Sequence, residues 1–325
     1  MRILVTGGCG FLGSHVCDHF LKNTDANLVV LDRLNYASLG FDRLRESNVF
    51  DDSRVSVLAA DFTKPIVDGL AQEIGPVDYV LHLGAETHVD RSIANPEAFV
   101  MANVVGTMHV LNFARTLPSL KRMFYFSTDE VFGPAPVGTF YKEWDRYDSG
   151  NPYSATKAGA EELCLAYANT YRLPLLITHC MNIVGEKQHK EKYVPLCIRK
   201  ILAGEPLSIH ADATRTKSGS RCWIHARNVA DAVLFLLEHG EQRQKYNIVG
   251  EERTNLEIAQ FIASVLGKPL KYELVSFHAT RPGHDLRYAL DGTKMKEMGW
   301  EPPTGLEESL AKTVRWTLEN PQWLR

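Results

Sequence analysis

The chain has 325 residues, enough for one large domain or two smaller ones, and 45% of them are hydrophobic, as in a globular protein with a sizeable core. A formal net charge of −3 gives no broad positive field, which argues against nucleic-acid binding. Apolar runs stay shorter than the roughly 20 residues of a membrane-spanning helix, and a strand expected close to the first residue leaves no room for a cleavable signal. We therefore expect a cytoplasmic protein without a membrane partner.

The first half of the chain alternates short apolar runs with amphipathic segments. The runs predict strands at Ile3–Thr6, Leu28–Asp32, Val55–Ala59, Tyr79–His82, Met123–Ser127 and Leu175–His179. The amphipathic segments predict helices near 11–22, 64–74, 95–116 and 153–171. This alternation is typical of βαβ units with right-handed crossovers, and it predicts an α/β protein with a Rossmann-type doubly wound parallel sheet.

The rhythm breaks after about residue 180. Glycine, proline and charged residues interrupt the chain, and shorter helices are expected near 194–203, 228–238, 255–266 and 305–318. We expect residues 1–180 to form the sheet domain and residues 181–325 a smaller, irregular α/β cap for the substrate. Some segments of the cap region are expected to return to the first domain.

Six cysteines are scattered along the chain without a Cys-x-x-Cys pair. We interpret them as reduced thiols of a cytoplasmic protein, and expect neither disulfides nor a metal site.

A glycine-rich loop follows the first expected strand and opens the first helix. Residues 7–13 read Gly-Gly-Cys-Gly-Phe-Leu-Gly, which fits both Gly-x-Gly-x-x-Gly and Gly-x-x-Gly-x-x-Gly. Glycines permit a tight turn and close approach of the backbone to a pyrophosphate, and the helix start offers free N–H groups. The order strand, loop, helix favours a dinucleotide site over a plain turn. Cofactor contacts are expected at Gly7, Gly10, Phe11, Leu12 and Gly13.

The second expected strand ends in an acidic residue. Asp32 lies 19 residues after Gly13, where a carboxylate can accept the adenosine ribose hydroxyls and repel a 2′-phosphate. This favours NAD over NADP. The neighbouring Arg33 could accommodate a 2′-phosphate, so the alternative stays open at this point.

Tyr153 and Lys157 lie four residues apart at the start of an expected helix. Residues i and i+4 share a helix face, so Lys157 can lie beside Tyr153 and under the cofactor ribose. A phenol with a pKa of about 10 needs about 4 kcal/mol of stabilisation to lose its proton near pH 7. A nearby ammonium and a positive nicotinamide can supply it. The alternative is a surface Tyr and Lys without a catalytic role.

Two acidic residues follow Thr128 at the carboxyl end of the fifth expected strand. Adjacent strand residues face opposite ways, so Asp129 and Glu130 can serve one substrate only if the chain turns at Asp129. The alternative is an acidic strand end solvated at the surface.

The chain resembles the extended short-chain dehydrogenase/reductases and, within them, the dTDP-glucose 4,6-dehydratases. The resemblance runs through nearly the whole sequence and is carried by residues 6–13, 82–92, 127–133, 153–157 and 281–288. The Thr-Asp-Glu stretch at 128–130 is its specific part, because related epimerases and decarboxylases generally lack the paired carboxyls.

The resemblance implies a role for each catalytic residue. Thr128 would hydrogen-bond the sugar 4-hydroxyl while Tyr153, assisted by Lys157, removes its proton and the C4 hydride passes to NAD. The resulting ketone acidifies the C5 proton, which Glu130 would remove while Asp129 protonates the departing C6 hydroxyl. Return of the hydride to C6 would give a 4-keto-6-deoxy sugar. The two carboxyls need different protonation states, so their environments should push their pKa values apart.

The resemblance also implies binding residues and an assembly. It places an adenine contact at Asp61 and Phe62 and the floor beneath the cofactor at Leu83 and Ala85. Helices 95–116 and 153–171 would pair across the two-fold axis of a homodimer. Contacts to the nucleotide sugar are implied at Thr87, His88, Asn182, Lys192, Arg221, Asn247, Arg281 and His284.

The cap departs from the family pattern at several positions. Cys222 replaces an Asp, Phe132 stands where Tyr is common, and the loop at 211–220 is a few residues longer than usual. His225 replaces a Tyr, and we expect a packed imidazole there. These departures bear on which base and sugar fit, so UDP-glucose and a UDP-N-acetylhexosamine are alternative substrates. A sugar 4-epimerase and an NAD-binding regulatory protein are alternative functions.

Overall fold

The computed structural model describes residues 1–276 and 286–325. Its centre is a seven-stranded sheet in the order β10-β6-β5-β4-β1-β2-β3, and all of its pairings are parallel. The strands are β1 (Arg2–Thr6), β2 (Asn27–Asp32), β3 (Val55–Ala59), β4 (Tyr79–His82), β5 (Arg122–Thr128), β6 (Leu175–Cys180) and β10 (Lys245–Ile248). The strand order reverses between β1 and β4, as in a doubly wound sheet, so the predicted fold class and all six predicted strands are confirmed.

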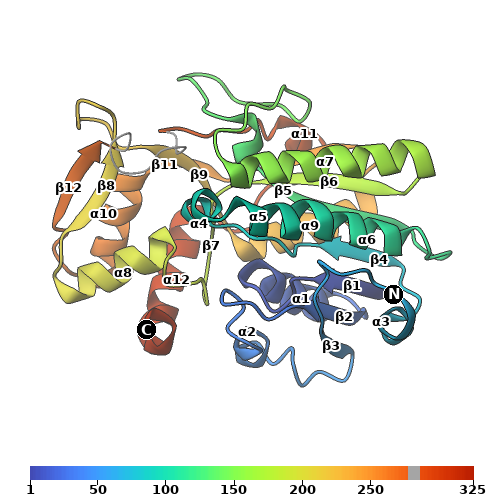
Figure 1. Ribbon diagram of the computed structural model, residues 1–325. Helices are drawn as coiled ribbons and strands as arrows, with labels where there is room; N and C mark the ends of the chain where they lie inside the picture. The colour runs from blue at the N-terminus through green and yellow to red at the C-terminus, as the bar shows by residue number, and fades with distance from the viewer. Residues whose placement is uncertain (277–285) are drawn as a thin grey trace.

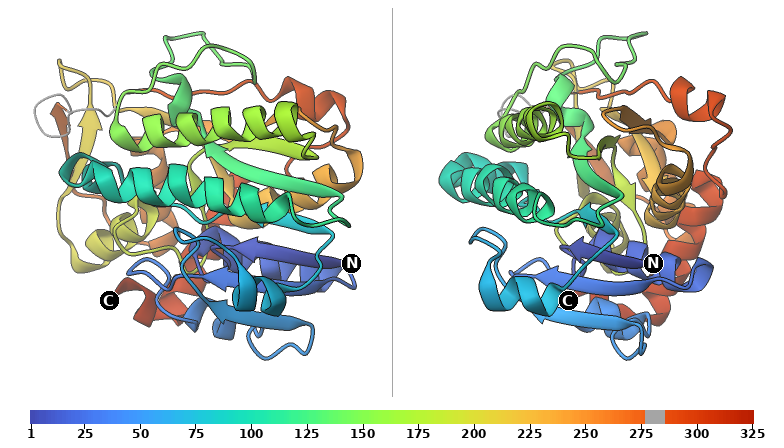
Figure 2. Two further views of the ribbon diagram at one scale, coloured as in Figure 1. Left: turned by 45° about the vertical axis from the view of Figure 1, so that its right-hand side comes forward. Right: turned by 90° about the vertical axis from the view of Figure 1, so that its right-hand side faces the viewer.

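Helices cover both faces of this sheet, as the end-on view in Figure 2 shows. Alternate side chains of β1 enter opposite cores, because successive strand residues point to opposite faces: Ile3 and Val5 join one, and Leu4 joins the other. The first face is covered by α1 (Phe11–Asn23), α9 (Ala226–His239) and α11 (Thr293–Glu297). The second is covered by α3 (Asp68–Ile74), α6 (Gly106–Ala114) and α7 (Pro152–Tyr171).

The expected helix at 95–116 is divided into several parts. It comprises α5 (Pro96–Phe99), a π-helical stretch (Val100–Val105) and α6, and it is preceded by the short α4 (Val89–Ala94). Another short helix that the sequence did not predict, α2 (Asp42–Glu46), lies in the segment between β2 and β3.

The cap has its own core at one end of the sheet (Figure 1). Its small sheets contain β7 (Ile183–Val184), β9 (Ser220–His225) and β11 (Glu251–Thr254) in one, and β8 (Leu207–Ala211) and β12 (Tyr272–Ser276) in the other. Its helices α8 (Tyr193–Ala203), α10 (Asn255–Leu266) and α12 (Leu306–Glu319) match predicted segments, and a 3-10 turn follows at Pro321–Leu324. Residues after 180 thus build the cap and also return β10 and α9 to the central sheet.

Two negative observations concern the described residues 1–276 and 286–325. No helix there is long and apolar enough to cross a membrane, and no group of three or more His, Cys, Asp or Glu side chains is arranged to hold a metal ion. All six cysteines are buried free thiols.

Candidate active site

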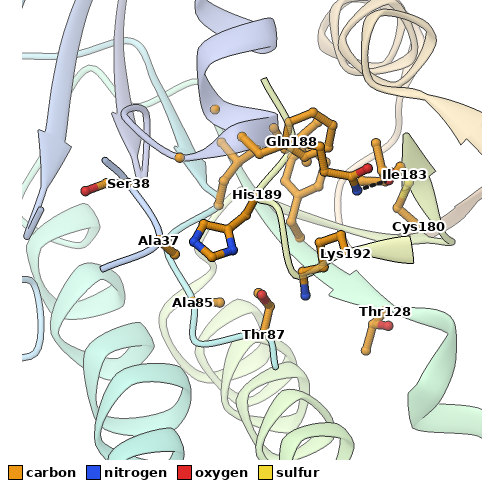
Figure 3. Close-up of a pocket in the computed structure, with 18 of the residues that line it drawn as sticks. Ala37, Ser38, Ala85, Thr87, Thr128, Cys180, Ile183, Gln188, His189 and Lys192 are labelled. Atoms are coloured by element: carbon orange, nitrogen blue, oxygen red, sulfur yellow. Dashed lines mark hydrogen bonds between the residues drawn. The ribbon is translucent and has the colours of Figure 1, made fainter. Parts of the chain in front are cut away.

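A pocket of about 370 Å³ lies where the central strands end. Parallel sheets of this type bind ligands outside the carboxyl ends of their strands, at the point where the strand order reverses. The pocket is lined from the sheet side by the glycine loop and the ends of β2, β4, β5 and β6, and from the cap by the segment 180–194. Figure 3 shows His189 and Lys192 extending from that segment toward Ala85 and Thr87.

The glycine loop has a backbone that only glycine tolerates. Gly7 adopts φ +71°, and a Cβ there would lie 2.7 Å from the Cα of Gly84. A Cβ on Gly13 would lie 2.2 Å from the carbonyl oxygen of Gly7. The loop is therefore closely packed against the sheet and leaves a smooth backbone surface, with α1 starting at Phe11.

The acidic end of β2 also faces the pocket. Asp32 is buried, and its carboxylate accepts the N–H of Cys9 at 3.0 Å and of Leu34 at 2.8 Å. The neighbouring Arg33 is ion-paired with Glu86, whose carboxylate also accepts the side-chain amide of Asn35 at 2.9 Å. The arginine that could have received a 2′-phosphate thus has a carboxylate partner.

Most of the other predicted cofactor residues reach the pocket. Phe62 packs on the backbone of Gly84, since a Cβ there would lie 2.6 Å from its ring. Asp61 is different: it is exposed at the surface, where its carboxylate accepts the N–H of Thr63 at 2.9 Å. The predicted cofactor residues in the lining are Gly7, Gly10, Phe11, Leu12, Gly13, Asp32, Phe62, Leu83, Ala85, Tyr153 and Lys157.

The acidic pair enters the pocket because the chain turns directly after β5. Thr128 is the last strand residue and the N-cap of a 3-10 helix at Asp129–Phe132. Its hydroxyl donates to Oδ1 of Asp129 at 3.0 Å and lies 3.4 Å from the N–H of Glu130, and both acids line the pocket. The expected turn at Asp129 is therefore present, and both carboxyls can face one ligand.

Burial raises the pKa of both carboxyls of the acidic pair. Burial raises the pKa of Asp129 to about 6, although Arg221 opposes the rise. Burial and then the charge of Asp129 raise the pKa of Glu130 to about 7, although a hydrogen bond from Asn151 opposes the rise. That bond joins Nδ2 of Asn151 to Oε2 of Glu130 at 3.0 Å. Both groups therefore titrate close to neutral pH, where general acids and bases are most effective.

Helix α7 places Tyr153 and Lys157 beside this pair. Asn151 caps the helix through a reciprocal capping box with Ser154, so α7 begins with Tyr153 at the pocket. Burial and then the charge of Glu130 raise the pKa of Tyr153 well above its usual value, while a hydrogen bond with Thr128 lowers it. Burial lowers the pKa of Lys157 to about 8, and its ammonium donates to the carbonyl of Phe126 at 2.5 Å.

The predicted substrate residues are only partly brought together. Thr87, Asn182 and Lys192 line the pocket. Arg221 lies close enough to lower the pKa of both Asp129 and Glu130. His88 is not a lining residue, but its Nε2 lies 3.8 Å from a carboxylate oxygen of the lining residue Glu191.

Asn247 does not reach the pocket. Its side chain is fully buried in the sheet, where Nδ2 donates to the carbonyls of Tyr141 and Asp291 at 3.0 Å each and Oδ1 faces Nδ1 of His179. The resemblance implies a substrate contact for Asn247, but its side chain is part of the protein interior. Arg281 and His284 lie outside the described residues.

Several lining residues were not predicted from the sequence. Glu191 contacts His189 at 3.4 Å and Arg91 at 3.7 Å, and Tyr36 stacks under Arg91, whose guanidinium lies 3.6 Å from the ring centre. These residues come from three separate segments. A Glu directly before the predicted Lys192 was the available signal, but one charged residue in a charged loop carried no weight by itself.

The three substituted positions are interior, whereas the longer loop at 211–220 is exposed over residues 213–217. His225 is buried, with Nε2 3.0 Å from a carboxylate oxygen of Glu186, which confirms the expected packed imidazole. Cys222 and Phe132 are also buried, in one small apolar cluster.

Comparisons with known proteins agree with this geometry. Residues 4–313 match the family model described as GDP-mannose 4,6 dehydratase. A dTDP-glucose 4,6-dehydratase of Salmonella typhimurium is 36% identical, covering 100% of this chain and 94% of the relative. One of Neisseria gonorrhoeae is 38% identical, covering 98% and 96%.

Solved structures give the same result. DesIV, a dTDP-glucose 4,6-dehydratase from Streptomyces venezuelae solved with NAD bound, superposes with a TM-score of 0.89 at 36% identity, covering 99% of this chain and 98% of that one. A UDP-glucose 4-epimerase from Thermus thermophilus, also in complex with NAD, superposes with a TM-score of 0.85 at 27% identity, covering 97% and 98%.

Proposed function

Because this chain belongs to the dTDP-glucose 4,6-dehydratase family of extended short-chain dehydrogenase/reductases, we propose that it is an NAD-dependent nucleotide-sugar 4,6-dehydratase. It removes water from an NDP-hexose and forms the NDP-4-keto-6-deoxy sugar, and dTDP-glucose is the substrate that we propose. The observation that carries this proposal is the acidic pair of the buried Asp129 and the partly buried Glu130, which lies beside Tyr153 in one pocket and titrates near neutral pH.

The pocket residues fit NAD. The glycine loop has no room for a Cβ at Gly7, which suits a pyrophosphate against its backbone. Asp32 offers its carboxylate to the adenosine ribose, and the pairing of Arg33 with Glu86 removes the cation that a 2′-phosphate requires. When bound, NAD accepts the hydride from C4 of the sugar and later returns it to C6.

Oxidation at C4 is assigned to Thr128, Tyr153 and Lys157. Thr128 orients the 4-hydroxyl, and Tyr153 accepts its proton as the C4–H bond breaks. A buried phenol with a raised pKa needs a neighbouring positive charge for this task. Lys157 lies one turn along the same helix face and provides that charge. The product of this step is the 4-ketone.

Elimination is assigned to the acidic pair. Glu130 takes the C5 proton that the ketone has made acidic, and Asp129 gives its proton to the C6 hydroxyl, which leaves as water. After the hydride has returned to C6, Glu130 gives its proton back to C5. The proton gained by Tyr153 then restores Asp129, and the Thr128 hydroxyl bonds both groups and can carry it. Each catalytic group therefore has its starting protonation state again after one turnover.

When Asp129 and Glu130 together hold a single proton, this mechanism needs the less populated of the two possible arrangements. Glu130 has the higher pKa of the two, because burial and then the charge of Asp129 raise it, whereas the reaction needs the proton on Asp129. The reaction therefore starts from the minor member of two coupled protonation states.

We assign cofactor and catalytic residues to residues 1–180 and substrate binding to residues 181–325. Asn182, Lys192 and Arg221 would hold the nucleotide diphosphate and base, since the cationic side chains of Lys192 and Arg221 suit phosphate oxygens. We also propose a cytoplasmic homodimer. The six free thiols fit a reducing compartment, and Val100 and Met101, at 42% and 38% exposed, leave apolar surface on the helices expected to pair. Size-exclusion chromatography with light scattering tests the dimer.

A parallel incubation with dTDP-glucose and UDP-glucose tests the function. The reaction is followed by the alkaline absorbance of a 4-keto sugar and by mass spectrometry. We expect loss of one water from dTDP-glucose. Conversion without a mass change would indicate the 4-epimerase instead, and the absence of turnover with both sugars would favour an NAD-binding regulatory protein.

A further inference from the structure

A buried carboxylate lies behind the pocket, outside the residues assigned to the reaction so far. Glu161 follows Lys157 by one helical turn on α7 and has no exposed surface. Its Oε1 accepts the hydroxyl of Ser127, and its Oε2 accepts the hydroxyl of Tyr147. Two side-chain nitrogen atoms also contact Oε2: Nε2 of His179 at 3.1 Å and Nζ of Lys245 at 3.3 Å.

These partners come from three neighbouring strands, β5, β6 and β10, and from one loop. Ser127 directly precedes Thr128 on β5, and His179 is its register partner on β6. Lys245 belongs to β10. Tyr147 lies in the loop that leads to Asn151, the residue that holds Glu130. Glu161 therefore joins helix α7 to the strand end and to the loop that together carry the catalytic groups.

The hydrogen bonds fix the protonation states in this cluster. The side-chain amide of Asn247 directs its Nδ2 at two carbonyl oxygens, those of Tyr141 and Asp291, so its oxygen must face His179. Nδ1 of His179 therefore donates to Asn247, and Nε2 donates to Glu161, which makes the ring an imidazolium. Glu161 is surrounded by four donors and is ionised; the charge and hydrogen bond of His179 hold its pKa at about 2 against the effect of burial.

Glu161 supplies negative charge close to Lys157. The ammonium of Lys157 lies over the ring of Tyr125 at 4.2 Å, and His82 and Cys164 also face it. Burial keeps these three groups uncharged at neutral pH, because it lowers the pKa of His82 to about 3 and raises those of Tyr125 and Cys164. Among the described residues acting on Lys157, the largest effect that favours its charged form comes from Glu161.

We propose that Glu161 is a positioning residue of the dehydratase, whose buried carboxylate locks α7 to the end of β5 and keeps the ammonium of Lys157 protonated beside Tyr153. This proposal rests on the proposed function, because it gives Lys157 a task in the proton transfer by Tyr153. Loss of the carboxylate should make Lys157 neutral at a lower pH. Since Lys245 and His179 offset part of the charge of Glu161, the expected change is about one pH unit.

The test compares three variants of the NAD-bound protein. Glu161→Gln removes the charge and keeps the shape, and Glu161→Asp keeps the charge. Lys245→Met disturbs the same buried cluster but leaves the carboxylate in place. Two quantities are measured against pH: kcat/KM with dTDP-glucose, and the rate at which acetic anhydride acetylates Lys157, followed by peptide mass spectrometry. The labelling needs no turnover, so it reports on Lys157 even if the substrate proves to be a different one.

We expect Glu161→Gln to move the alkaline limb of kcat/KM and the labelling midpoint of Lys157 down together by about one pH unit. Glu161→Asp should keep both close to the wild-type positions, and Lys245→Met should lower stability without moving either one down. If Glu161→Gln does not fold, the double variant with Lys245→Met, which leaves less unpaired charge buried, is measured in its place.

The proposal is overturned if the charge-removing variant labels with the wild-type midpoint, or if Lys245→Met moves the midpoint down equally. Wild-type protein that turns over neither dTDP-glucose nor UDP-glucose would count against the proposed function. A labelling midpoint that still moved in Glu161→Gln would leave the link between Glu161 and Lys157 standing.

Discussion

Replacement of Glu130 by Gln should stop the reaction between its two halves. The amide has nearly the same shape, and its oxygen can still accept the Asn151 Nδ2 group that now lies 3.0 Å from Oε2. It cannot accept the C5 proton. A positioned base contributes about 10²- to 10⁴-fold, so elimination should slow by that factor, equivalent to about 3–5 kcal/mol in the barrier. Oxidation at C4 uses Thr128, Tyr153 and Lys157 and should continue.

The assay follows from this separation. Stopped-flow absorbance of reduced cofactor should rise on mixing Glu130→Gln with dTDP-glucose and then persist, while mass spectrometry shows almost no loss of water. The matched control is Glu162→Gln, an exposed glutamate on α7, which should behave as the wild type. A variant that dehydrates at the wild-type rate, or one that never forms reduced cofactor, would refute the role of Glu130 as the base that acts after oxidation.

The same substitution has a measurable effect on stability. The pKa of Glu130 is raised from 4.5 to about 7. A carboxyl with a raised folded-state pKa stabilises the fold most when it is protonated, below its unfolded pKa, and this stability is lost as pH rises through about 7. The difference corresponds to at most about 3 kcal/mol. Thermal unfolding should therefore show Glu130→Gln more stable relative to wild type at pH 8 than at pH 5. An equal difference in stability at both pH values would contradict the raised pKa of Glu130 in the folded protein.

Three further predictions concern other steps. Asp129→Asn should slow water loss about 100-fold with dTDP-glucose, because the amide has no proton to give to the C6 hydroxyl; an unchanged rate would argue against Asp129 as the acid. Tyr153→Phe should abolish the rise of reduced cofactor on mixing with substrate, and a normal rise would exclude the phenol as the first base. Gly7→Ala should strongly weaken NAD binding in calorimetry, since a Cβ there meets Gly84 at 2.7 Å; unchanged affinity would show that the loop can relax.

The sequence was sufficient where the signal is local. The six predicted strands have strong apolar runs, and the glycine loop and the Asn151–Ser154 helix start are fixed by turn and capping chemistry between near neighbours. That Tyr153 and Lys157 share one helix face follows from their spacing of four residues and from helix geometry alone. These features therefore predicted the sheet, the nucleotide loop and the position of the catalytic helix.

The sequence was not sufficient where pairing is distant. Strand β10 reads Lys-Tyr-Asn-Ile, which has too few apolar residues to predict a buried strand. Lys245 and Asn247 are tolerated in the interior because Glu161, His179 and the carbonyls of Tyr141 and Asp291 satisfy them. The family resemblance placed Asn247 in the substrate site. Nothing in the local sequence argued against that placement, because no local pattern shows which polar residues find buried partners.

The acidic pair shows the division most clearly. Residue types and order identified Thr128, Asp129 and Glu130 as a candidate acid–base unit. Only the fold determined that the strand ends at Thr128, that the chain then turns so that both carboxyls face one pocket, and that burial brings their pKa values to about 6 and about 7. Amino-acid identity thus determines which chemical groups are present, whereas desolvation and mutual distance, which determine when those groups hold protons, arise from contacts between segments far apart in the chain.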